Sequence, residues 1–356
     1  MRRSTKIAAV GAAAVLALAG CARGDDTDTS ASGSVELNCE GGGDGPKVGI
    51  AYDVGGRGDN SFNDAAAQGM VKAVEELDAT CAEAEAGDAE PESAREDRLR
   101  TLAEDGYNPI IGVGFAYSEA VNAVAPDFPE ISFAVVDGFD PDDQANDNVA
   151  YLGFAENEGS FLVGVAAAEK TESDHVGFVG GVHNDLIKKF EAGYAAGVEA
   201  VNPDIAVDVK YIEESDLSGF ADPAGGKAAA AGMYDNGADV VYHAAGGSGT
   251  GVFDAAVDAG EGNWAIGVDS DQYLTASAPQ KPHILTSMLK RVDTATFDMV
   301  SSVADGKPLV SYQTYDLAHD GVGYSTSGGF IDDITDVIDG YAEKIKSGDI
   351  KVPTTP

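Results

Sequence analysis

Residues 47–69 read KVGIAYDVGGRGDNSFNDAAAQG, and the fold class can be predicted from these residues. Val48–Tyr52 is a short apolar run that predicts a buried strand, with Asp53 at its carboxyl end. A glycine-rich turn follows, and Ser61 with Asp64 three residues later fits a capping box that opens a helix. Apolar residues continue from there at helical spacing. The stretch therefore predicts a strand, a turn and a helix, the first unit of a parallel α/β sheet.

The polar residues of this unit fall where a parallel sheet binds its ligand. Loops that follow the carboxyl ends of such strands face the ligand crevice. We therefore expect four side chains at the mouth of this crevice: the carboxylate of Asp53, the hydroxyl of Ser61, the ring of Phe62 and the amide of Asn63. No GxxxxGKS or GxxxxGKT pattern follows, so a phosphate-binding loop is not predicted. A capped turn with Phe62 in the core is the structural alternative.

The rest of the chain repeats the alternation of strand and helix. Apolar runs alternate with helical segments as far as Phe154, and the pattern restarts at His175. This alternation predicts an α/β protein with two doubly wound parallel-sheet lobes. Two such lobes joined by three crossings are typical of the type I periplasmic-binding fold, which binds its ligand between them. The predicted boundaries are a signal peptide at 1–20, a disordered tether at 21–45, a first lobe at 46–152 plus 273–312, and a second lobe at 153–272 plus 313–350.

Composition excludes several classes of partner. The chain has 356 residues, of which 44% are apolar, enough for about two domains with real cores. Lys and Arg number 22 and Asp and Glu number 61, so the net charge is −39. Phosphates would be repelled, which argues against nucleic acid (DNA or RNA) or an anionic membrane face as partners. The excess of acid suits a protein outside the cell, and a salt-adapted organism is an alternative source of it.

The amino terminus is a targeting segment. Basic residues precede the apolar run Ile7–Ala19, which is short for a membrane-spanning helix. The sequence LAGC that ends at Cys21 resembles the bacterial lipobox, so we expect cleavage before Cys21 and lipidation of its thiol. The protein would then be exported and anchored to the outer face of the cell membrane. An ordinary secretory signal is the alternative.

Two cysteines remain, Cys39 before the first strand and Cys81 near the second. Export permits disulfides, so we expect that these two pair. A closed loop of about 40 residues would stabilise the fold by roughly 4 kcal/mol on the chain-entropy model. Two buried free thiols are the alternative.

Seven motifs, in order, resemble those of the basic membrane protein (Bmp) family of purine nucleoside receptor-like, ABC transporter substrate-binding lipoproteins. They span roughly residues 47–325, and their joint order carries the resemblance. The motifs are GGRGDNSFN at 55–63, FAENEGSFL at 154–162, VGFVGG at 176–181, FEAG at 190–193, HAAGG at 243–247, GVDSDQ at 267–272 and SMLKRVD at 287–293.

The resemblance implies a set of side chains that bind the base of a nucleoside. Phe62 and Phe220 are similar to the two stacking rings of the family. Asn63 and Asp137 are similar to its base-edge contacts, with Asp53 nearby. Phe220 is reached through a segment, SDLSGFADP, that departs from the family pattern. A helix cap or a solvated loop acid is the alternative role for Asp137, and also for Asp269.

The resemblance also implies contacts to the sugar. Asp269 resembles the acid that binds the ribose hydroxyls, and Lys290 resembles the cleft lysine of the family. Phe115 follows a predicted strand and completes the expected ligand-binding set. The glycines of the HAAGG motif, Gly246 and Gly247, would let the backbone approach a ligand. The surrounding GGSGTG sequence satisfies neither GxGxxG nor GxSxG, so neither a dinucleotide loop nor a nucleophile elbow is predicted.

We therefore expect a lipid-anchored substrate-binding protein of an ABC importer that binds nucleosides, most of all purine nucleosides. Its partners would be the nucleoside, the permease subunits, and the membrane through Cys21, and the protein would act as a monomer. No cofactor, metal or catalytic residue is expected, because no HExxH or CxxC pattern occurs. The alternatives are a sugar-binding lipoprotein of an importer, a ligand sensor, and a nucleoside hydrolase, for which the acidic cluster DxDxxxDD is missing.

Overall fold

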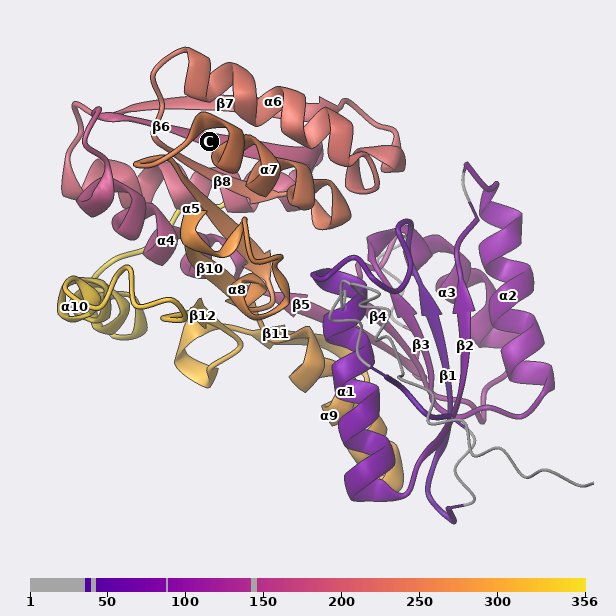
Figure 1. Cartoon of the computed structure of the whole chain (residues 1–356). Coiled ribbons are helices and arrows are strands. Elements are labelled where there is room, and N and C mark those ends of the chain that lie inside the picture. Colours follow the sequence, from indigo (N-terminus) through magenta and orange to yellow (C-terminus); the bar gives the residue numbers. More distant parts are fainter. Residues whose placement is uncertain (1–35, 40–42, 88, 142–145) are drawn as a thin grey trace, which may run out of the picture. The chain divides into compact units, whose positions relative to one another are not determined.

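The computed structural model describes residues 36–39, 43–87, 89–141 and 146–356. These residues form two six-stranded sheets, which we take as the cores of a first and a second lobe (Figure 1). The first sheet consists of β1 (Lys47–Tyr52), β2 (Thr80–Glu85), β3 (Ile110–Val113), β4 (Phe133–Val136), β5 (Val149–Phe154) and β11 (Ser311–Tyr315). The second consists of β6 (His175–Val182), β7 (Ala206–Glu213), β8 (Val240–Ala244), β9 (Trp264–Asp269), β10 (Ile284–Lys290) and β12 (Val322–Tyr324).

The strand orders are β11-β5-β4-β3-β1-β2 and β12-β10-β9-β8-β6-β7. The paired strands run parallel, with β12 antiparallel to β10 as the exception. In each lobe the order reverses beside the first strand, as in doubly wound sheets. The predicted fold class, two parallel α/β lobes of the type I periplasmic-binding kind, is confirmed.

Helices cover both faces of each sheet. In the first lobe α1 (Phe62–Leu77) packs with α9 (Val292–Ala304), and α2 (Glu92–Glu104) packs with α3 (Ser118–Val124). In the second lobe α4 (Glu156–Lys170) packs with α5 (Asp185–Val201), and α6 (Pro223–Asp235) packs with α7 (Gly249–Ala259). The short helix α8 (Gln272–Thr275) follows β9, and α10 (Thr335–Lys346) lies against α4.

The buried strands explain why the sequence shows apolar runs without alternation. Ile110 and Ile111 are neighbours on β3, and both are fully buried, but they enter different hydrophobic cores. Successive side chains of a strand point to opposite faces, and a parallel sheet has helices on both. Both faces therefore require apolar residues.

The second crossing between the lobes differs from the prediction. Residues 273–312 were expected in the first lobe, but β10 pairs in parallel with β9 in the second sheet. The chain crosses only after Lys290, since α9 packs on α1. The assignment of 313–350 to the second lobe was also wrong at its start, because β11 pairs with β5. A buried apolar strand has the same local sequence pattern in either sheet, so its partner is decided by tertiary packing.

Residues 36–39, which the sequence analysis assigned to a disordered tether, are ordered in the structure. Cys39 and Cys81 form a disulfide across 42 residues of sequence, and Cys81 lies on the edge strand β2. Leu37 also packs against the buried hydrophobic residues of the protein. The predicted tether at 21–45 is therefore wrong for residues 36–39, which the disulfide holds to the lobe. The signal peptide and Cys21 lie outside the described residues.

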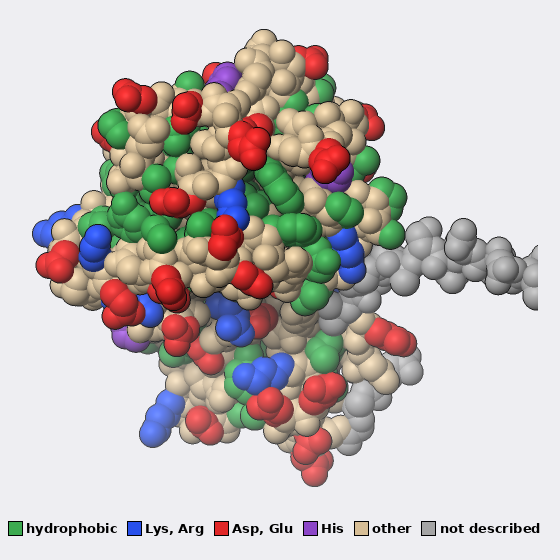
Figure 2. Space-filling view, turned by 60° about the vertical axis from the view of Figure 1, so that its left-hand side comes forward, with side chains coloured by type: hydrophobic (Ala, Val, Ile, Leu, Met, Phe, Trp, Pro, Cys, Tyr) green, Lys and Arg blue, Asp and Glu red, His purple; other side chains and the backbone are tan. Residues whose placement is uncertain are grey.

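Acidic side chains are scattered over the face shown in Figure 2 and do not gather into one patch. They outnumber the basic side chains on that face, in keeping with the net charge of −39. Within the described ranges, which begin at residue 36, no helix has the length and apolar character needed to cross a bilayer.

Candidate functional site

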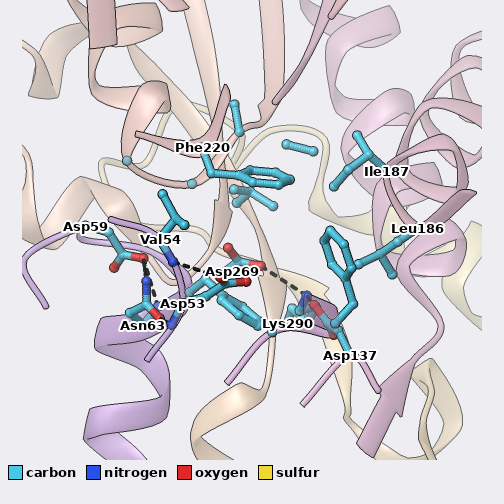
Figure 3. A pocket seen from close by; sticks show the side chains of 18 of the residues that line it. Asp53, Val54, Asp59, Asn63, Asp137, Leu186, Ile187, Phe220, Asp269 and Lys290 are labelled. Atoms are coloured by element: carbon cyan, nitrogen blue, oxygen red, sulfur yellow. Dashed lines mark hydrogen bonds and ion pairs between the residues drawn. The ribbon is translucent and has the colours of Figure 1, made fainter. Parts of the chain in front are cut away.

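A cavity lies at the carboxyl ends of strands from both sheets (Figure 3). Its empty volume is about 570 Å³, a figure that includes space open to solvent at the mouth. The lining residues are Asp53, Val54, Asp59, Phe62, Asn63, Gly114, Phe115, Asp137, Leu186, Ile187, Phe190, Phe220, Ala244, Ala245, Gly246, Gly247, Val268, Asp269 and Lys290. Every residue predicted to bind ligand is in this set except Ser61.

Ser61 is not a lining residue, but it binds one of the carboxylates that line the cavity. The side chain is fully buried and donates a hydrogen bond from Oγ to Asp269 Oδ2 at 2.6 Å. It makes no hydrogen bond that caps α1, so the predicted capping role of Ser61 is wrong. Ser61 is in the first lobe and Asp269 ends β9 in the second, so this bond joins the two lobes.

Asp59 caps α1 in place of Ser61. Its Oδ1 accepts from the backbone N–H groups of Ser61 and Asp64, at 3.0 and 3.1 Å. Its Oδ2 accepts from the backbone N–H and the side-chain Nδ2 of Asn63, at 2.8 and 3.1 Å. A carboxylate at a helix amino terminus satisfies free N–H groups and interacts favourably with the helix dipole. Sequence reasoning missed Asp59, although an acid just before a helix start is a known capping signal.

Asn63 has little free hydrogen-bonding capacity for a ligand. Its Nδ2 donates to Asp59, and its Oδ1 accepts from the backbone N–H of Asp53 at 3.1 Å. The amide therefore connects the end of β1 to the start of α1. The structure places Asn63 in the cavity wall as predicted, but with both ends of its amide used inside the protein.

Asp53 stands at the end of β1 and is 8% exposed. Its Oδ1 accepts from the N–H of Val54 at 2.8 Å. Burial raises the pKa of Asp53 to about 6, against smaller opposing effects of Val54 N–H and Arg95. Gly114, with φ of 105°, is required beside it, because a Cβ there would lie 2.2 Å from Asp53 Oδ2.

A buried lysine lies between two buried carboxylates. Lys290 ends β10, and its Nζ is 2.7 Å from Asp137 Oδ2 and 3.6 Å from Asp269 Oδ1. The three side chains are 2%, 5% and 7% exposed. Burial alone would lower the pKa of Lys290, but the charges of Asp137 and Asp269 outweigh it and raise the pKa to about 12. For Asp269 burial outweighs the lysine, so its pKa is raised.

Asp137 and Asp269 also share an uncommon backbone conformation. Asp137 directly follows β4 and has φ of 58°, and Asp269 ends β9 with φ of 64°. Residues other than glycine rarely occupy this left-handed region, and those that do cluster at functional sites. Asp137 Oδ1 is buried and has no hydrogen-bond partner among the described residues. One carboxylate oxygen in the cavity wall is thus left to accept from a ligand.

Aromatic rings form much of the remaining wall. Phe115 opens a short 3-10 helix at Phe115–Tyr117, and its ring meets that of Phe220 edge-on with centroids 6.5 Å apart. Lys290 Nζ lies 4.7 Å from the ring centre of Phe62 and 5.4 Å from that of Phe190. Two of these rings, those of Phe62 and Phe190, therefore lie close to the buried lysine.

The amino-terminal turns of α5 supply an apolar wall that the sequence prediction missed. Leu186, Ile187 and Phe190 all face the cavity. Their spacing is that of an ordinary core-facing helix, so no sequence signal separates them from buried packing residues. Gly246 and Gly247 line the cavity near the backbone carbonyl of Phe220, which a Cβ at either position would approach within 3.3 Å.

The site is built for binding. Its polar groups are carboxylates and one ammonium set among apolar and aromatic side chains. Within the described residues no cluster of His, Cys, Asp and Glu has the arrangement needed to hold a metal ion. His243 is fully buried and packs edge-on against Phe253. Burial lowers the pKa of His243 to about 3.

Comparison with known proteins agrees with this geometry. The family model described as "ABC transporter substrate-binding protein PnrA-like" (Bmp) matches residues 47–356. A CD4+ T-cell-stimulating antigen of Listeria monocytogenes is 38% identical over 87% of this chain and 88% of its own. The ABC transporter nucleoside-binding protein BmpA of Lactococcus lactis is 34% identical over 95% of this chain and 97% of its own.

A solved structure agrees as well. The ABC transporter solute-binding protein from Aeropyrum pernix superposes with a TM-score of 0.74 at 29% identity, covering 87% of this chain and 93% of that one. Proteins of this family bind substrates and are not enzymes. The chain therefore belongs to the Bmp family of PnrA-like ABC transporter substrate-binding proteins.

Proposed function

We propose that this substrate-binding protein captures nucleosides, purine nucleosides foremost, and delivers them to its ABC permease. The main support for this proposal is that phenylalanine rings and buried carboxylates line the same cavity. Phe62, Phe115 and Phe220 offer apolar faces to a heterocycle, and stacking contributes about 1–3 kcal/mol per base. The nucleoside-binding BmpA of Lactococcus lactis, similar along nearly the whole chain, supports the same ligand class.

The polar groups of the cavity suit a ligand that is polar at both ends. Asp53 lies on one side, and Asp137, whose Oδ1 has no hydrogen-bond partner among the described residues, lies on the other side with Lys290 (Figure 3). A base edge and a pentose are the two polar ends of a nucleoside. Carboxylates accept N–H and O–H donors in charge-assisted hydrogen bonds, which are about twice as strong as neutral ones.

The charge of the cavity disfavours phosphorylated ligands. Four aspartates line it, and Lys290 is the cation among its described lining residues. Lys290 is moreover already paired with two of those aspartates. A phosphate would meet mostly like charge at close range. We therefore expect nucleosides to bind in preference to nucleotides.

Binding and closure are coupled in this proposal. Lys290 of the second sheet pairs with Asp137 of the first lobe, and Ser61 of the first lobe bonds Asp269 of the second. These bonds join the two lobes directly. A ligand held by both lobes stabilises the closed arrangement, which the permease then recognises.

Isothermal titration tests the ligand class. We expect sub-micromolar to micromolar dissociation constants for inosine, guanosine or adenosine, and none for ribose or hexoses. Phe62→Ala and Asp269→Asn should each weaken binding tenfold or more. Asp258→Asn is the matched control, since this exposed acid pairs with Lys227 on the surface. Hexose binding without nucleoside binding, or unchanged affinity in both site variants, would contradict the proposal.

The proposal includes a lipid anchor at Cys21. Its support is the lipobox-like sequence LAGC at residues 18–21. Expressed in a bacterium that processes lipoproteins, the full-length protein should sediment with membranes and label with a fatty acid. Cys21→Ser should release it, unlabelled, into the soluble fraction. Membrane association that survives Cys21→Ser would count against a lipid anchor at this residue.

A further inference from the structure

The loop between β1 and α1, residues 53–61, forms one side of the cavity but has little intrinsic reason to be ordered. Gly55, Gly56, Gly58 and Asn60 all have positive φ, between 53° and 95°. A segment with this many glycines samples many backbone conformations unless other groups restrain it. The cavity residues Asp53, Val54 and Asp59 nevertheless belong to it.

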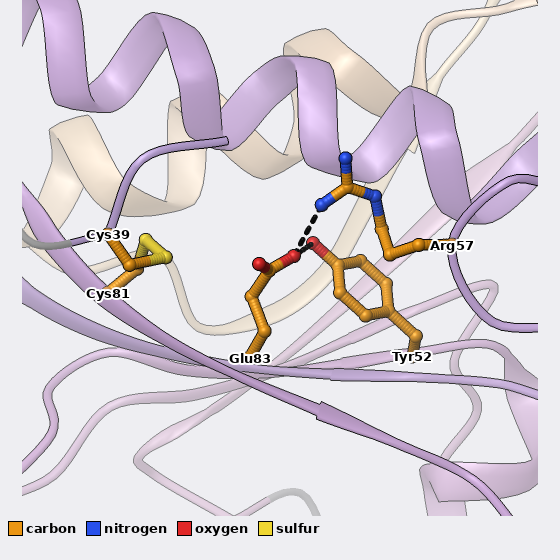
Figure 4. Close-up of a disulfide and its surroundings, with 5 residues drawn as sticks. All are labelled: Cys39, Tyr52, Arg57, Cys81 and Glu83. Atoms are coloured by element: carbon orange, nitrogen blue, oxygen red, sulfur yellow. Dashed lines mark hydrogen bonds and ion pairs between the residues drawn. A yellow bond between two sulfur atoms is a disulfide. The ribbon is translucent and has the colours of Figure 1, made fainter. Parts of the chain in front are cut away.

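Arg57 ties this loop to the edge strand β2. Its Nη1 donates to Glu83 Oε1 at 2.5 Å, and Tyr52 OH donates to the same carboxylate at 2.9 Å. The backbone N–H of Arg57 also donates to Glu85 Oε1 at 3.2 Å. Figure 4 shows the guanidinium beneath α1 and above Tyr52, with the Cys39–Cys81 disulfide beyond Glu83.

The same guanidinium meets a second carboxylate on α1. Arg57 Nε donates to Asp64 Oδ1 at 3.3 Å. Asp64 in turn accepts from the backbone N–H of Gly58 at 3.0 Å and from that of Asn60 at 3.0 Å. These two N–H groups flank Asp59, whose side chain lines the cavity. Arg57 and Asp64 therefore fix the backbone on both sides of a cavity residue.

We propose that Arg57 is a positioning residue for the ligand, which holds the loop at residues 53–61 in its binding conformation before the ligand arrives. Within the described part of the chain, Arg57 is not among the residues that line the cavity, so its influence passes through the loop. Its side chain is 17% exposed and that of Asp64 is 4% exposed, which makes the bond less screened than a surface pair. An ordered loop spares the ligand the entropy of ordering it.

Loss of the Arg57 side chain should therefore weaken ligand binding, an expectation that rests on the proposed function only for the choice of ligand. Apparent affinity falls in proportion to the fraction of molecules whose site is competent. Arg57→Gln removes both ion pairs and leaves the cavity wall unchanged. If it leaves the loop ordered in about one molecule in five to ten, nucleoside affinity falls five- to tenfold. Arg57→Lys keeps the positive charge, but its single ammonium group cannot bind Glu83 and Asp64 through separate nitrogens. We therefore expect a loss of nucleoside affinity that is smaller than in Arg57→Gln.

The experiment combines inosine titration with amide hydrogen exchange in the ligand-free protein. We expect the amides of Gly58 and Asn60 to exchange faster in Arg57→Gln by several-fold and to regain protection with inosine. Arg100→Gln is the matched control, because Arg100 forms an exposed pair with Asp127 in the same lobe. This control should change neither affinity nor exchange in the loop.

The outcomes separate this inference from the proposed function. Faster exchange at Gly58 and Asn60 together with weaker binding supports Arg57 as a positioning residue. Unchanged exchange in Arg57→Gln overturns it, and so does faster exchange with wild-type affinity. If the wild-type protein binds no nucleoside, the proposed function is refuted. The exchange rates of Gly58 and Asn60 alone then show whether Arg57 orders the loop. Arg57→Lys provides the same readings if Arg57→Gln does not fold.

Discussion

Removing the buried lysine of the cavity should destabilise the protein much more than removing a lysine from its surface. Lys290 is 2% exposed and touches two carboxylates that are themselves buried. Its pKa rises from 10.5 to about 12 on folding, which corresponds to about 2 kcal/mol at any pH below 10.5. Lys290→Met also leaves Asp137 and Asp269 uncompensated. Breaking a buried pair in this way costs roughly 3–5 kcal/mol, so we expect a loss of that size at pH 7.5.

The loss should depend on pH, with a defined sign. Burial already raises the pKa of Asp269, and without the lysine this pKa rises further. A carboxyl group whose folded pKa is raised binds its proton more tightly in the folded state, so the variant regains stability as pH falls. We therefore expect the difference from wild type to be smaller at pH 5 than at pH 7.5.

Urea unfolding at both pH values, followed by the fluorescence of Trp264, measures the difference. Lys227→Met is the matched control, since Lys227 pairs with Asp258 but the two side chains are 43% and 66% exposed. The free energy of unfolding should fall by only about 0–1 kcal/mol in Lys227→Met. The reasoning is refuted if Lys290→Met unfolds like the control, or if its loss is the same at both pH values.

Two further predictions concern the whole fold. Cys39→Ser opens a disulfide that spans 42 residues, so the free energy of unfolding should fall by about 4 kcal/mol on the chain-entropy model; equal urea midpoints for the variant and the oxidised wild type would contradict this. The net charge of −39 should make the melting temperature rise between 0.1 and 1 M NaCl, because the screening length falls from about 10 to 3 Å and self-repulsion weakens. Calorimetry across that range checks it, and a flat or falling melting temperature would show that charge repulsion does not limit stability.

Much of the architecture could be predicted because it depends on local patterns. Apolar runs, glycine-rich turns and helical spacing are properties of neighbouring residues, and they identified the alternation that builds both lobes. Local patterns do not predict which sheet a strand joins, as the strand after residue 283 shows. Its apolar sequence predicts a buried strand correctly, but β10 pairs in the second sheet and not in the first. Both sheets offer equally apolar surroundings, so the sequence contains no local sign of the choice.

The predicted site residues were brought together, but several have other contacts than expected. Asp53, Phe62 and Asp269 line the cavity as placed, because strand ends of a parallel sheet meet at one edge. Ser61 was expected to cap α1, and Asp59 does so instead. Two acceptors within three residues of a helix start compete for the same N–H groups, and the backbone path of the loop decides between them. The wall of α5 was missed because ligand-facing and core-facing apolar residues have the same spacing.

The two α/β lobes, the polar residues that follow the first strand and the excess of acid could be predicted without a structure, because each depends on composition or on residues close together in the chain. Which carboxylates share Lys290 depends instead on how the chain folds. Asp137, Asp269 and Lys290 are separated by up to 153 residues and meet only when two sheets lie with their carboxyl ends together. The strength of such a pair depends on burial and on distances of a few ångströms, and these quantities exist only after the chain has folded.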